Sequence, residues 1–215
     1  MRQPLPFLFV PFLFVCLLSL ALTGCLGKAA PDTLYALEPL TGTDTAPGAE
    51  LSGMIMIMPV RLPPQLQSRG IVMEQGAGGP QMLVGRLWAG PLDEQMGAKL
   101  AADLQTLLHS PNVALYPGPR YSRPLYQVET EIIRFSGDDS TFTLRAVSTI
   151  SSPNERRILS REAFSQSVRL DGQGARAYVV AASQALDAFS RKLAATLTPL
   201  PKTAAPDKQP AARIF

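Results

Sequence analysis

The chain has 215 residues, of which 46% are hydrophobic and 17% charged, and its formal net charge is +3. This apolar content can form a core, so the composition excludes a chain that is disordered throughout, and the length favours one domain with terminal extensions. The small charge is unlike that of a nucleic-acid-binding domain. Two cysteines and one histidine argue against a disulfide scaffold, a structural zinc site and histidine-based catalysis.

Residues 1–24 predict a signal peptide. Arg2 precedes an apolar segment, residues 5–22, and small residues follow it at Thr23 and Gly24. A cationic start, an apolar centre and small residues before a cleavage site are typical of a secretory signal. A membrane-spanning helix is the alternative, since the segment approaches that length, but prolines in and beside it disfavour a continuous helix. These prolines are Pro4, Pro6 and Pro11.

The end of this signal, Leu-Thr-Gly-Cys at residues 22–25, resembles the bacterial lipoprotein box. The resemblance implies that Cys25 is acylated on its thiol and becomes the first residue of the mature chain. Acyl chains contribute about 0.8 kcal/mol per buried methylene, and two or more hold a protein stably on a bilayer. Leu26 follows the cysteine. In Gram-negative bacteria the residue at this position influences sorting of the lipoprotein. A residue other than aspartate, as here, resembles the default that directs a lipoprotein to the outer membrane. Residues 25–33 are the expected lipidated tether.

Short strands are predicted after the tether. Residues 34–37 are one candidate, and the continuous apolar run at 54–58 is typical of a strand buried on both faces. Residues 71–74 and 81–84 flank a glycine-rich turn and predict a hairpin. A helix is predicted over residues 93–108, because its apolar residues recur at three- and four-residue spacing.

The second half predicts a further strand, a meander and a second helix. The strand is expected at residues 113–116, and largely alternating apolar and polar residues over 126–168 predict a three-stranded antiparallel meander. An apolar stripe predicts a helix over 175–197. The proline-containing residues 199–215 are expected to be disordered. Two long helices without regular strand–helix alternation favour one α+β domain, residues 34–198, with both helices on one face of a mixed or antiparallel sheet.

Two groupings could carry metal or acid–base chemistry, but each has a simpler interpretation. Met54, Met56 and Met58 share one face of a predicted strand and could bind Cu(I), although a core strand filled by flexible apolar side chains is favoured. Asp138 and Asp139 could bind calcium or act as an acid pair. Their place in a predicted hairpin turn favours an ordinary turn.

Catalytic groupings are not evident in the sequence. His109 is expected at the end of the first helix, where an imidazole interacts with the helix dipole or with water. The sequence has neither a Gly-x-Ser-x-Gly nucleophile elbow nor a glycine loop of the phosphate-binding type. We therefore expect a protein that is not an enzyme and that uses no cofactor or metal.

Four segments in chain order resemble the ABC-type transport auxiliary lipoproteins, the PqiC-like family. They are Leu-Tyr-Ala-Leu at residues 34–37; Pro-Val-Arg-Leu-Pro at 59–63 with Leu66 and Ile-Val at 71–72; Gly-Arg-Leu-Trp-Ala-Gly-Pro-Leu at 85–92; and Tyr-Gln-Val at 126–128 with Arg-Phe at 134–135. The last predicted helix also fits, so the resemblance spans about residues 34–197. The third segment is the most specific, with Gly90 where the family more often has an acidic residue.

The candidate interface residues lie within these segments. They are Tyr35, Arg86, Trp88 and Pro91. Trp88 is the only tryptophan and could anchor a partner, since tryptophan is enriched at interface hot spots. Packing against the first helix is the favoured alternative for this side chain.

The resemblance implies a lipoprotein on the periplasmic face of the outer membrane. Such proteins accompany transporters built from an MCE-domain protein, a permease and an ATPase, which move phospholipids or other hydrophobic molecules across the periplasm. We expect an MCE-domain partner, a membrane anchor at Cys25 and no nucleic acid, and a homo-oligomeric ring stays open. The alternatives are a periplasmic lipid-binding carrier and an envelope-integrity or assembly factor without a direct transport role. A hydrolase is the least favoured alternative.

Overall fold

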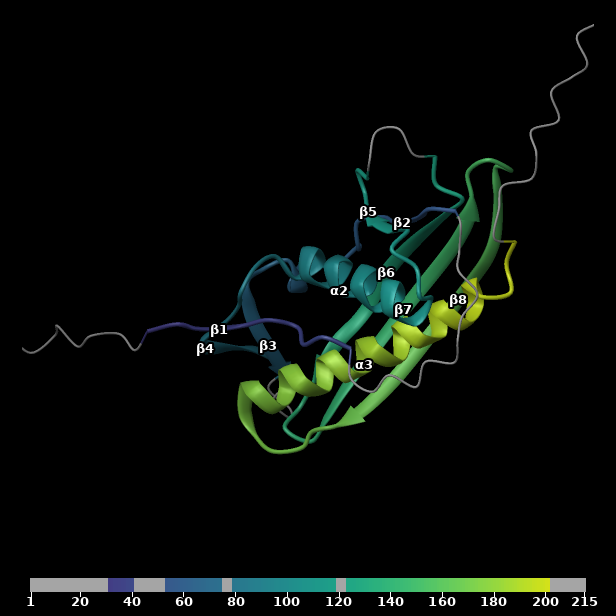
Figure 1. Ribbon diagram of the computed structural model, residues 1–215. Helices are drawn as coiled ribbons and strands as arrows, with labels where there is room; N and C mark the ends of the chain where they lie inside the picture. The colour runs from purple at the N-terminus through teal and green to yellow at the C-terminus, as the bar shows by residue number, and fades with distance from the viewer. Residues whose placement is uncertain (1–30, 41–52, 75–78, 119–122, 202–215) are drawn as a thin grey trace, which may run out of the picture. The chain divides into compact units, whose positions relative to one another are not determined.

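A five-stranded sheet carries two long helices on one face (Figure 1). The computed structural model describes residues 31–40, 53–74, 79–118 and 123–201, and the part from Thr33 onward belongs to one unit. The predicted signal peptide, most of the predicted tether and most of the predicted tail lie outside the described residues. Among the helices that the structure describes, none combines the length and apolarity that crossing a bilayer requires.

The five strands are, in their order across the sheet, β5 (Val113–Leu115), β2 (Ile55–Ile57), β6 (Tyr126–Gly137), β7 (Thr141–Ser152) and β8 (Arg157–Arg169). β2 pairs in parallel with both neighbours, and β6, β7 and β8 form the predicted antiparallel meander. All three residues of β2 are buried, as its apolar run predicted. In the first half of β6, Tyr126, Val128, Thr130 and Ile132 are buried and alternate with half-buried polar residues.

A bulge in β6 reverses this alternation. Ile133 lies between two paired residues, Ile132 and Arg134, and has no partner of its own in β7. An inserted residue shifts the side chains that follow it to the other face of the strand. Phe135 is therefore 2% exposed, although counting by twos from the start of β6 would place it outside the core.

The two helices are α2 (Leu92–Leu107) and α3 (Gly174–Leu197), and both agree with the predicted helices to within one residue. α3 packs on β7 and β8, α2 packs on β2 and β5, and the helices contact each other. Side chains fill the interior between α3 and the sheet, where Phe142, Leu144 and Phe189 are each 0% exposed. The predicted α+β class, with two helices on one face of a mixed sheet, is confirmed.

A separate three-stranded sheet consists of β1 (Thr33–Tyr35), β4 (Pro80–Trp88) and β3 (Gly70–Glu74), in this order. β1 runs parallel to β4, and β3 and β4 form the predicted hairpin. A short 3-10 helix, η1 (Pro64–Leu66), precedes β3 and was not predicted. The sequence favoured one sheet, whereas the structure divides the strands between two, because strand pairing depends on contacts between distant segments.

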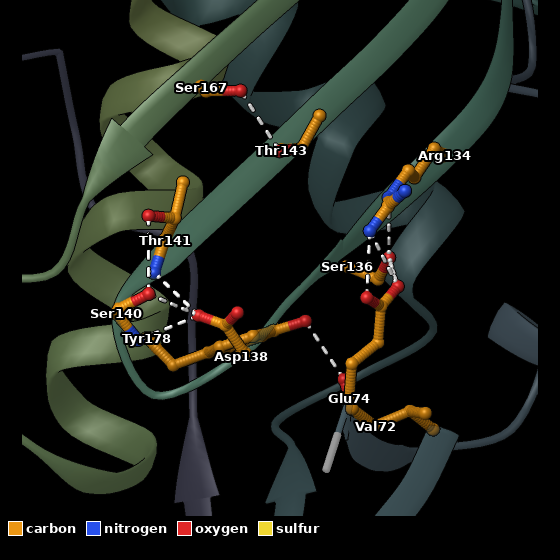
Figure 2. Close-up of polar contacts among 10 residues, drawn as sticks. All are labelled: Val72, Glu74, Arg134, Ser136, Asp138, Ser140, Thr141, Thr143, Ser167 and Tyr178. Carbon is orange, nitrogen blue, oxygen red and sulfur yellow. Dashed lines mark hydrogen bonds and ion pairs between the residues drawn. The ribbon is translucent and has the colours of Figure 1, made fainter. Parts of the chain in front are cut away.

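A polar cluster connects the two sheets at the end of β6 (Figure 2). Arg134 Nη2 lies 2.8 and 2.7 Å from the two carboxylate oxygens of Glu74 in β3. Ser136 Oγ donates a hydrogen bond of 2.7 Å to the same carboxylate. Charge-assisted bonds of this length fix the position of β3 relative to β6.

A series of aromatic side chains continues this connection into α3. The ring centroids of Trp88 and Phe135 are 6.3 Å apart, those of Phe135 and Phe142 are 4.7 Å apart, and those of Phe142 and Tyr178 are 5.0 Å apart. The last two pairs meet edge to face, which is a favoured geometry for aromatic rings. The Tyr178 hydroxyl donates a hydrogen bond of 2.8 Å to the carbonyl of Val72, and burial raises the pKa of this phenol.

Candidate functional site

Four buried polar side chains meet between α2 and α3. Lys99 and Asp103 are one turn apart on α2, and the Lys99 Nζ atom lies 3.1 Å from Asp103 Oδ2. The same ammonium lies 2.6 Å from Asp187 Oδ1 on α3, and Ser190 Oγ donates a hydrogen bond of 2.7 Å to Asp103 Oδ2. Each of these residues is at most 7% exposed. We call Lys99, Asp103, Asp187 and Ser190 the interhelical cluster.

The electrostatics of the interhelical cluster are dominated by burial. Removal from water raises the pKa of the Asp103 carboxyl, and the hydrogen bond from Ser190 and the charge of Lys99 oppose this shift. A buried ion pair is retained when good geometry and further hydrogen bonds offset the loss of hydration. The cluster therefore depends on all of its members, and the loss of one leaves the others in an unfavourable environment.

The segment directly after β1 crosses both helices and forms a groove over this cluster. The Leu37 amide donates a hydrogen bond of 3.1 Å to Gln95 Oε1 on α2. The Glu38 amide donates one of 2.9 Å to Ser183 Oγ on α3, and the Glu38 carboxylate lies 2.8 Å from Arg176 Nη2. These contacts hold residues 36–40 across the helical layer.

This groove has a volume of about 420 Å³. Its walls are mainly apolar, and Lys99 and Asp103 form part of its lining. Among its apolar lining residues are Ala36, Leu37, Pro39, Leu40, Ala98 and Ala102. A groove with apolar walls and a few polar groups can receive a small apolar group or a side chain of a partner.

The pH dependence of stability should reveal the buried Asp103. Because its pKa is raised in the folded state, Asp103 stabilises the fold at acid pH, and this contribution is lost as pH rises through the folded-state pKa. We expect the stability of the Asp103→Asn variant, relative to the wild type, to increase from about pH 4 toward neutrality. Urea unfolding at a series of pH values measures this difference.

Asp138 provides a control with the opposite sign. Hydrogen bonds from the side chain and amide of Ser140 and the amide of Thr141 lower the pKa of this exposed carboxyl (Figure 2). The stability that it contributes is present above the unfolded-state pKa and is lost in acid. The deficit of Asp138→Asn should therefore grow with pH. Parallel curves for the two variants would contradict at least one of the two assignments.

The structure brings three of the sequence-predicted interface residues together in the β1–β4 pair, where Tyr35 pairs with Trp88 and Arg86 lies two residues before Trp88, but their exposure differs. Arg86 is exposed, and its Nη1 atom donates a hydrogen bond of 2.6 Å to Thr33 Oγ1. Tyr35 is half-buried, and Pro91 is exposed directly before α2. Trp88 is 3% exposed. Cys25 lies outside the described residues, so its acylation, like an interface role for the other four, stays a prediction.

Replacing Trp88 by alanine should lower the free energy of unfolding by about 3–5 kcal/mol, because it removes a large buried side chain that contacts Phe135. Thermal unfolding measures the loss, and co-purification with the partner complex measures binding. Binding that persists at a temperature where the variant is folded would assign Trp88 to packing alone. Lost binding by a folded variant would instead support an interface role.

The other singled-out residues occupy ordinary structural positions. Met56 is 5% exposed within β2, and Met54 and Met58 flank this strand. Asp138 accepts the hydrogen bonds of the β6–β7 turn, which Asp139 follows. His109 is exposed just after α2, with a φ of 48°. No group of three or more His, Cys, Asp or Glu residues able to hold a metal ion occurs within the described ranges.

Sequence reasoning missed the interhelical cluster. The available signal was the position of Lys99 and Asp103 among Met96, Leu100 and Leu104 on the apolar side of the predicted helix. Charged residues rarely lie fully buried unless they are paired. Their partners are on α3, far away in the sequence, so the pattern of α2 alone could not identify them.

Comparisons with known proteins bear on the function and the fold. A family model for the ABC-type transport auxiliary lipoprotein component matches residues 35–194. No curated protein matches the chain significantly.

Solved structures share the fold. The crystal structure of an uncharacterized protein has a TM-score of 0.64 at 18% identity, covering 78% of this chain and 99% of the other. A Xanthomonas campestris protein of the DUF330 family has a TM-score of 0.65 at 16% identity, covering 77% of this chain and 95% of the other. At these identities the likeness concerns the fold alone.

Proposed function

Because this chain belongs to the family of ABC-type transport auxiliary lipoprotein components, we propose that it is the outer-membrane accessory of an MCE-type transport system. The system moves phospholipids or other hydrophobic molecules across the periplasm. The family match over residues 35–194 is the observation that carries this proposal. The family is not an enzyme class, so the chain acts by binding.

The anchor and the domain have separate tasks in this proposal. Cys25, acylated on its thiol, holds the protein on the periplasmic face of the outer membrane. The folded domain binds the periplasmic part of an MCE-domain protein, which works with a permease and an ATPase. Several copies binding around one MCE assembly would form a ring, which we include as the oligomeric form to test.

The packing of the interior favours an adaptor over a carrier that encloses lipid. Phe142, Leu144 and Phe189 fill the space between α3 and the sheet, where a carrier of this architecture would hold its ligand. The groove over the interhelical cluster is a shallower site, of about 420 Å³, and charged groups form part of its lining. A rigid, filled domain is suited to presenting a fixed surface to a partner.

Crosslinking in the native host tests the proposed partner. The full chain, carrying an affinity tag, is crosslinked in intact cells and purified, and the captured proteins are identified by mass spectrometry. We expect an MCE-domain protein to be enriched over a control outer-membrane lipoprotein that carries the same residues 1–33. Equal capture by both proteins would contradict the proposal.

The groove supports one alternative, a lipid-binding carrier. Its apolar walls could hold part of an acyl chain. Mass spectrometry of extracts from the purified chain distinguishes the two functions. Stoichiometric lipid that Ala98→Trp removes would favour the carrier, because the larger side chain occupies the groove. Lipid-free protein that still captures the MCE-domain partner would favour the adaptor.

A further inference from the structure

β4 presents apolar side chains to solvent beside the start of the domain. Val84 is 97% exposed and Met82 is 55% exposed, while Leu34 of the adjacent β1 is 56% exposed. Scattered single apolar residues are common on protein surfaces, but neighbouring ones often mark an interaction site. We call Leu34, Met82 and Val84 the β4 patch.

The backbone of β4 explains why Val84 projects so far. Gly70 of β3 pairs with Leu87, and Val72 pairs with Met82, so the register shifts between these two pairs. Gly85 has a φ of 65° within this irregular stretch, a conformation that glycine adopts without strain. A bulge of this kind turns side chains away from the regular sheet, and it leaves Val84 without cover.

The position of the tether identifies what lies next to this patch. Thr33 pairs with Arg86, and the two side chains share a hydrogen bond of 2.6 Å. Thr33 follows Cys25 by eight residues in the sequence, which span about 28 Å at most when fully extended. If Cys25 carries the lipid, as in the proposed function, the β1–β4 edge is held close to the bilayer surface.

From this arrangement we infer that the β4 patch is a second membrane contact. Val84, Met82 and Leu34 enter the boundary between headgroups and acyl chains. Such a contact is weak alone. The acyl anchor keeps the patch at a high local concentration near the surface, so a weak contact is sufficient to orient the domain.

Orientation of this kind would point the end of the meander that holds the start of β6 away from the membrane and into the periplasm. The end of β6 carries Arg134, which contacts β3 of the small sheet, whereas the start of β6 lies at the opposite end (Figure 1). Ile158 of β8 pairs with Ser151, which pairs with Gln127 near the start of β6. Ile158 is 62% exposed and therefore provides a matched apolar position far from the patch.

Site-specific fluorescence tests the inference. Val84→Cys and Ile158→Cys are each introduced into the full, lipidated chain and labelled with an environment-sensitive thiol probe. The only other cysteines are Cys16, in the predicted signal, and Cys25. The proteins are reconstituted into vesicles of phosphatidylethanolamine and phosphatidylglycerol. We expect lipid-embedded nitroxide to quench the probe at position 84 several-fold more than the probe at 158, and aqueous iodide to show the reverse order.

Each alternative outcome has a separate meaning. Equal quenching at the two positions, in protein that floats with the vesicles, overturns the membrane contact and leaves the proposed function intact. Protection of position 84 from both quenchers also overturns it, because a second copy or another protein then covers the patch. Protein that does not float and whose Cys25 reacts with the probe overturns the lipid anchor, and with it both proposals.

Discussion

Replacing Lys99 by methionine is expected to lower the free energy of unfolding by about 3–5 kcal/mol, because it removes the ammonium from between two buried carboxylates. The loss should increase with pH. Without Lys99, one of the influences that lower the pKa of Asp103 is gone, so this carboxyl favours its neutral form more strongly in the folded state. Urea unfolding at acid and at neutral pH measures both effects.

An exposed ion pair gives the matched control. Lys192 on α3 lies 2.7 Å from Glu162 on β8, but the two side chains are 49% and 40% exposed. Exposed pairs of this kind contribute about 0–1 kcal/mol, so Lys192→Met should have a small effect. Similar losses in the two variants, or a Lys99→Met loss below about 1 kcal/mol, would show that the interhelical cluster does not stabilise the fold as argued.

Changing Cys25 to serine should release the protein from the membrane. Serine lacks the thiol that the lipoprotein pathway acylates, and an unacylated chain lacks the buried methylenes that hold it on a bilayer. The weak contact of the β4 patch cannot retain the protein alone. We expect the wild type in the outer-membrane fraction and the variant outside it, with mass spectrometry showing loss of the acyl groups.

The chain contains its own control for this experiment. Cys16 lies within the predicted signal peptide, which cleavage before Cys25 would remove, so Cys16→Ser should leave acylation and fractionation unchanged. An unmodified Cys25 in the wild type would contradict the lipoprotein box. Release caused by the Cys16 change would show that export is being disturbed.

The local elements could be predicted because their patterns are complete within short segments. The apolar stripes of α2 and α3 recur at helical spacing, and the alternation in the first half of β6 has the period of a strand. The apolar run of β2 indicated burial on both faces. The family resemblance could also be identified from ordered short segments, and the family model matches residues 35–194.

The sites depended on contacts that no local pattern contains. The bulge at Ile133 interrupts the alternation of β6, and only pairing with β7 shows where the extra residue lies. Trp88 was identified as a candidate, but its burial follows from contact with Phe135 on another sheet. The β4 patch likewise required the register of β4 against both β1 and β3.

By itself the sequence determined the helices, the meander and the family, and it predicted the export signal and the acylation site, which stay predictions. Each of these depends on residues that are close together in the chain. Only the tertiary structure decided that the strands form two sheets, that Lys99 and Asp103 meet Asp187 and Ser190, and that the exposed Val84 lies on the strand that pairs with β1. The physical reason is that pairing partners and burial are chosen by the whole fold, through segments that lie far apart in the sequence.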